Sequence, residues 1–89
     1  MSTNEIQYLT NIISTVDPKI GAAIKTLTLL FNFFNTSTKR SEAVEEIERR
    51  AIRIIQVLAN FKDKTVPYYK ELEIRLYEDL WLLEKIKNG

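Results

Sequence analysis

Apolar residues between residues 42 and 62 recur at alternating spacings of three and four, the most regular pattern in the chain. This spacing marks one face of an α-helix, and here it extends over about three heptads. The positions are Val44, Ile47, Ala51, Ile54, Leu58 and Phe61. A seam of this length predicts a long helix that packs against other helices at the shallow angle typical of bundles.

The remainder of the chain predicts three more helices, because its 89 residues include only two Gly and two Pro to interrupt them. Ser2 with Glu5 has the spacing of a capping box, Asp17 before Pro18 suits a helix start, and so does Pro67. We expect helices over residues 4–16, 18–35, 42–62 and 67–86, within a single domain of residues 1–89. The fold class is all-α: either a four-helix antiparallel bundle or helical hairpins completed by dimerisation.

The second and fourth predicted helices carry apolar side chains on two sides. A surface helix usually has an apolar stripe about 100° wide, whereas the arc on residues 18–35 is roughly 200°. An aligned outer stripe with aromatic residues is typical of an interaction site. The predicted interface residues are Leu29, Phe33, Ile74, Tyr77 and Trp81. We expect a homodimer or another oligomer, and the alternative is association with a different protein. Two internal faces in an irregular bundle would produce the same pattern.

The composition removes most catalytic and metal-binding chemistry. The chain has no Cys and no His, so it lacks disulfides, thiolate ligands and the usual base at neutral pH. A cluster of glutamates precedes arginines at spacings that favour ion pairs along a solvated helix face. The cluster is Glu42, Glu45, Glu46 and Glu48, with Arg49 and Arg50 as the i,i+4 partners. We therefore expect no enzyme activity, no cofactor and no metal site.

Asp79 projects onto the inner face of the fourth predicted helix, among leucines. A buried carboxylate needs a cation or several hydrogen-bond donors. Either Asp79 lies at the rim of this face beside Arg75, or it forms a buried ion pair with Arg50 or Arg53 that fixes the register of two helices.

Basic residues around the start of the third helix suggest an alternative function, nucleic-acid binding. The candidates are Lys39, Arg40, Arg49, Arg50 and Arg53. Phosphate contacts require basic groups on one face, and the intervening glutamates would repel the same phosphates. The net charge of +1 gives no general attraction to a polyanion.

The N-terminal stretch has Glu5 where a signal peptide would have basic residues, so we expect a cytoplasmic, intracellular protein. The longest apolar run, residues 20–34, is interrupted by Lys25 and Asn32 and is shorter than the roughly 20 residues that a transmembrane helix needs. Abundant Ile, Leu, Lys and Glu beside an absence of Cys would suit a thermophile source.

Overall fold

The computed structural model describes the whole chain, residues 1–89, as four helices without strands. They are α1 (Thr3–Ile12), α2 (Pro18–Asn35), α3 (Glu42–Ala59) and α4 (Pro67–Asn88). The first predicted helix extends four residues too far, because Thr15 turns back to donate its N–H and hydroxyl to the Ile12 carbonyl. The third extends three residues too far. Asn60 ends α3 by donating its side-chain amide to the Gln56 carbonyl, an alternative to helical pairing.

Side chains at the helix starts satisfy backbone N–H groups that have no partner within the helix. Ser2 and Glu5 form the capping box at α1, as their spacing predicted. Asp17 accepts hydrogen bonds from the N–H groups of Lys19 and Ile20 at the start of α2, and Ser41 accepts one from Val44 in α3. These caps fix where each helix begins and therefore which side chains point inward.

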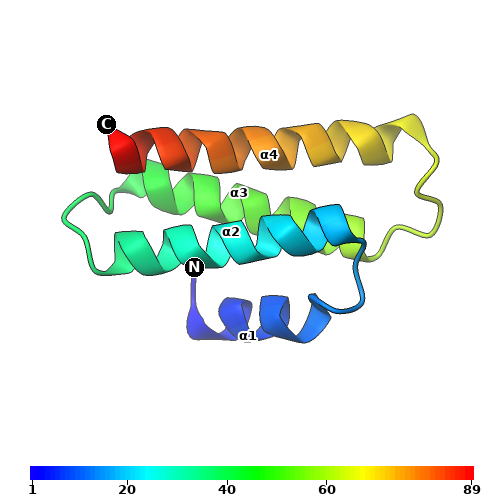
Figure 1. Cartoon of the computed structure of the whole chain (residues 1–89), viewed down its shortest axis with the longest axis horizontal. Coiled ribbons are helices and arrows are strands. Elements are labelled where there is room, and N and C mark those ends of the chain that lie inside the picture. Colours follow the sequence, from blue (N-terminus) through cyan, green and yellow to red (C-terminus); the bar gives the residue numbers. More distant parts are fainter.

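Figure 1 shows α2, α3 and α4 side by side as three long helices, with the shorter α1 alongside α2. Contacts between helices define their alignment. The start of α3 lies beside the end of α4, since Lys39 donates to the Lys87 carbonyl over 2.6 Å. The opposite ends of these two helices meet where Phe61 packs edge-on against Tyr69. These two contacts show that α3 and α4 lie beside each other along their length.

The core contains 17 buried hydrophobic side chains drawn from all four helices. The inner face of α4 is buried along its length, through Tyr69, Leu72, Leu76, Leu80 and Leu83. On α3 the buried face is rotated relative to the predicted seam. Ile47 and Ile54 are only half-buried, while Ile52, Ile55 and the carboxylate of Glu48 lie inside. The rotation arises because α3 contacts both α2 and α4, so its buried surface is wider than one narrow seam.

None of the four helices combines the length and the apolar character that crossing a membrane would need. The apolar segment Leu27–Asn35 lies in the second half of α2. Leu27, Leu30 and Phe34 in this segment are buried, whereas Leu29 is exposed. The segment therefore contributes to both the core and the surface.

Candidate association surface

The outer stripe of α4 consists of Ile74, Tyr77 and Trp81. Their spacing of three and four places them on one side of the helix, turned away from the buried leucines. The exposed fractions are 53% for Ile74, 41% for Tyr77 and 58% for Trp81. Isolated exposed apolar residues are common on protein surfaces, but an aligned set of three large ones is typical of contact surfaces. The structure brings these three predicted interface residues together.

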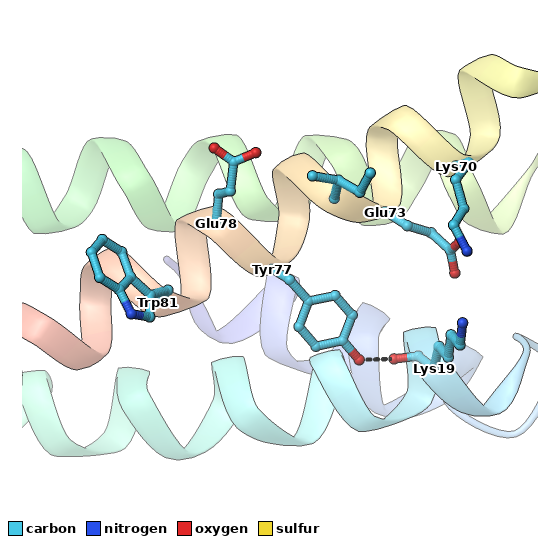
Figure 2. A pocket seen from close by; sticks show the side chains of 7 residues that line it. Lys19, Lys70, Glu73, Tyr77, Glu78 and Trp81 are labelled. Atoms are coloured by element: carbon cyan, nitrogen blue, oxygen red, sulfur yellow. Dashed lines mark hydrogen bonds between the residues drawn. The ribbon is translucent and has the colours of Figure 1, made fainter.

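The stripe forms a wall of an open groove of about 590 Å³ (Figure 2). Lys19 from the first turn of α2 lies across from α4, and Lys70 and Glu73 line the same end of the groove as Lys19. Trp81 lines the other end, with Tyr77 between. The groove is thus apolar along the middle and charged at its margin.

Tyr77 joins the two walls of the groove, because its hydroxyl donates a hydrogen bond to the Lys19 carbonyl over 2.7 Å (Figure 2). Burial of the phenol, followed by the negative charges of Glu73 and Asp17, raises the pKa of Tyr77 above its ordinary value. The hydroxyl therefore stays protonated near neutral pH and remains a donor. One face of the Tyr77 side chain is still free for a partner.

A second tie between α2 and α4 lies nearby, where the Tyr69 hydroxyl donates to the Asp17 carboxylate. Burial, with the charge and hydrogen bonding of Asp17, raises the pKa of Tyr69. Burial tends to raise the pKa of Asp17 as well, but the Tyr69 hydrogen bond, two backbone N–H donors and Lys64 together hold it below its usual value. Asp17 thus caps α2 and holds the first turn of α4 against it, which positions the outer stripe.

The two predicted interface residues of α2 differ in availability. Leu29 is 71% exposed, the largest exposed fraction among the large hydrophobic side chains. Phe33 is half-buried: its ring packs edge-on against Phe34 with centroids 5.2 Å apart, and the Lys87 ammonium lies 5.2 Å from its centroid. Part of the cover of Phe33 therefore comes from its own chain, and the rest of its ring remains accessible.

Leu29 and Phe33 still lie on one side of α2, because they are four residues apart. Lys87 of α4 approaches Phe33, but neither Phe33 nor Leu29 lines the groove beside the outer stripe. The structure therefore brings together the three predicted interface residues of α4 and does not bring the two of α2 into the same groove. Three other exposed hydrophobic residues, Val57, Tyr68 and Leu82, fall outside the predicted set and do not line the groove.

The predicted basic cluster does not form one free surface. Lys39 binds the carbonyls of Lys87 and Gly89, and Arg50 pairs with Asp79. Arg40 donates two hydrogen bonds to Glu48, and its guanidinium lies 5.3 Å from the ring centroid of Phe31. Arg49 and Arg53 are the two members of the cluster whose exposed side chains form neither an ion pair nor a hydrogen bond within the chain. Phosphate contacts by the other three would require these internal bonds to break.

Glu48 contradicts the expectation of a solvated acidic face, because its side chain is fully buried. Its carboxylate accepts from both terminal nitrogens of Arg40, at 3.1 and 3.0 Å, and lies 3.6 Å from the Met1 ammonium. The expected i,i+4 pairs within the cluster also do not form, and Glu45 instead lies 4.0 Å from Arg40. The sequence did contain a signal, since Glu48 follows Val44 by four residues and precedes Ile55 by seven, on one helix face.

Asp79 pairs with Arg50 rather than with Arg75, and only the carboxylate of this pair is buried, since the Arg50 side chain is 52% exposed. Asp79 is 5% exposed and accepts hydrogen bonds from Arg50 Nη2 at 2.6 Å and Nε at 3.3 Å. This hydrogen bond raises the pKa of Arg50 above its ordinary value, although burial opposes the shift. Arg75 pairs instead with Glu71, one turn earlier on the surface of α4. The Arg50–Asp79 pair links the middles of α3 and α4 and fixes their relative register.

The acidic side chains do not assemble into a metal site, since no three Asp or Glu groups lie close enough to hold an ion. Comparison of the chain with protein-family models, with curated proteins and with solved structures found no match.

Proposed function

We propose that this protein is a non-enzymatic interaction module that associates with a second copy of itself through the outer faces of α2 and α4. The observation that carries the proposal is the alignment of Ile74, Tyr77 and Trp81, each more than 40% exposed, along one groove. Tyr and Trp are enriched in protein interfaces and contribute a large share of binding energy where they become buried. Leu29 extends the apolar surface onto the neighbouring helix.

The size of the chain supports self-association. A domain of 89 residues buries only about 60 to 65% of the surface that its unfolded chain exposes, so its core is small. Covering exposed apolar area contributes about 25 cal/mol per Å², and this contribution is available to the outer stripe only through another molecule. An isologous dimer places the same patch of both copies in one interface and covers both stripes together.

The folded unit of this proposal is an antiparallel four-helix bundle in each chain, rather than hairpins that fold only by exchange with a partner. The support for this choice is that 17 core side chains, and the ion pairs of Glu48 and Asp79, find their partners within one chain. Dimerisation then adds an interface to a formed core.

Sedimentation equilibrium at micromolar concentration tests the proposal. We expect a species heavier than the 10.4 kDa of one chain. Trp81→Ala should lower the average mass toward that of one chain, because it removes the most exposed aromatic ring of the stripe. Phe33→Asn should have a smaller effect, since Phe33 is partly covered already. Glu45→Gln on α3, outside the proposed interface, is the control and should change nothing. A wild-type protein that remains a monomer would rule out self-association.

A further inference from the structure

The outer stripe of α4 ends in opposite charges. Continuing its spacing of four and three adds Lys70 before Ile74 and Glu84 after Trp81, so the full series is Lys70, Ile74, Tyr77, Trp81 and Glu84. Lys70 and Glu84 are exposed, and neither forms an ion pair within the chain. Each is seven residues from Tyr77, in opposite directions. The stripe is therefore an apolar centre with a cation at one end and an anion at the other.

We propose that two copies pack their α4 helices in opposite directions about a two-fold axis beside Tyr77, so that Lys70 of each copy faces Glu84 of the other. This arrangement rests on the proposed self-association and specifies its geometry. Residues at equal distances from Tyr77 then oppose each other, and Ile74 falls opposite Trp81 of the second copy to within one residue. The stripe is complementary to itself only in this orientation.

Packing in the same direction would have the opposite electrostatic result. Lys70 would then face a second Lys70, and Glu84 would face a second Glu84, and like charges in contact are unfavourable. Pairing of opposite charges mainly selects the orientation of the two chains, whereas burial of apolar surface supplies most of the affinity. The charges at the two ends therefore determine how copies align, and the aromatic centre determines that they bind.

Two neighbouring side chains fit this arrangement. Lys85 follows Glu84 in sequence but is turned by about 100° around the helix. Its ammonium lies 4.9 Å from the ring centroid of Trp81 in the same chain, so Lys85 contacts this ring at the edge of the stripe. Leu29 of the neighbouring helix α2 is 71% exposed and lies outside the groove, and the proposed arrangement has the second copy extend over it. The second copy would thus cover the exposed apolar residues of both helices.

Cross-linking through single cysteines tests the orientation, because the native chain has no Cys. We expect a mixture of Lys70→Cys and Glu84→Cys proteins to form a disulfide between the two variants under mild oxidation. Each variant alone should cross-link poorly, since its two thiols would lie about 21 Å apart along the helices. Packing in the same direction predicts the reverse: each variant cross-links with itself, and the mixture yields no mixed product.

A charge exchange provides a second test that leaves the apolar centre intact. Lys70→Glu and Glu84→Lys should each weaken association about tenfold, and the double variant should restore it, because surface ion pairs of this kind are modest but reversible. Lys62→Glu is the control for net charge, since Lys62 lies in the loop before α4. A double variant no tighter than the singles would overturn the arrangement.

Different results would rule out self-association and the antiparallel packing of the two α4 helices. If sedimentation shows a dimer that Trp81→Ala dissociates, yet the mixed cysteines do not cross-link, then self-association holds and the antiparallel register is wrong. If the wild-type protein is a monomer, both are wrong.

Discussion

The two apolar faces of α4 contain similar side chains but lie in different surroundings. On the inner face, Leu76 and Leu83 are fully buried by α2 and α3, whereas Ile74 and Trp81 on the outer stripe are more than half exposed. The inner face even holds a carboxylate, Asp79, because Arg50 supplies its partner. Which face of α4 becomes core is therefore determined by whether another helix packs against it, and not by the apolar character of its residues. The difference also predicts that substitutions on the two faces affect different properties.

The largest effect on stability should come from the inner face. Leu76→Ala should lower the free energy of unfolding by about 2 to 5 kcal/mol, because it removes buried methyl groups and leaves a cavity among leucines. Urea denaturation at a protein concentration low enough to keep the chain monomeric measures this loss. Ile74→Ala on the outer stripe is the matched control and should cost less than about 1 kcal/mol. Equal losses for the two variants would mean that the faces do not differ as described.

The next effect concerns the charge buried on the inner face. Arg50→Met should lower the free energy of unfolding by about 1 to 3 kcal/mol, because the Asp79 carboxylate would lose its only cation while remaining largely shielded from water. Arg53→Met removes an exposed arginine of the same helix that has no ion pair, and it should have little effect. Denaturation curves in which the two variants coincide would argue against a structural role for the Arg50–Asp79 pair.

A smaller, pH-dependent effect on stability concerns the hydrogen bond between Tyr69 and Asp17, which holds α4 beside α2. The folded-state pKa of Asp17 lies below its usual value of 3.8, so its contribution to stability is fully present above pH 4 and is lost as the pH falls through the lowered pKa. Asp17→Asn keeps a helix cap but loses the charge that accepts the Tyr69 hydroxyl, and should cost about 1 kcal/mol at pH 7.

Denaturation of both proteins at several pH values checks this expectation. The wild-type advantage over Asp17→Asn should shrink below pH 4 and vanish under strongly acidic conditions. An advantage that stays constant over this range would show that ionisation of Asp17 plays no part in the tie.

The smallest change in stability should follow from Trp81→Ala. A side chain that is 58% exposed in the single chain contributes little to folding, so the monomer should lose less than about 1 kcal/mol. Thermal denaturation of dilute protein measures this difference. A loss as large as that of Leu76→Ala would indicate that Trp81 belongs to the core.

Periodicity predicted the all-helical architecture and the inner face of α4, because local spacing determines which residues share a side of a helix. It also identified two apolar faces on α4. Spacing places Glu48 on the same face of α3 as Val44 and Ile55, but it could not identify the partner that satisfies its buried carboxylate, because Arg40 reaches it from the preceding loop. The rotation of the α3 face has the same origin in tertiary packing.

The candidate surface was predictable in part for a related reason. The residues of the outer stripe were evident from their spacing on one helix, but the groove also requires Lys19, which α2 contributes across the interface between helices. Phe33 was predicted as an interface residue, and the contact of Lys87 with its ring depends on how the end of α4 lies on α2. Contacts between segments that are distant in the sequence therefore could not be predicted from local spacing.

The outer stripe of α4 should become covered when copies associate, and Trp81 reports on this directly because it is the only tryptophan in the chain. Its fluorescence emission should be measured through a dilution series from high-micromolar to nanomolar concentration. We predict a blue-shifted emission maximum at high concentration that moves to the position of a water-exposed indole on dilution. An emission maximum that stays at the exposed position at every concentration would contradict the account.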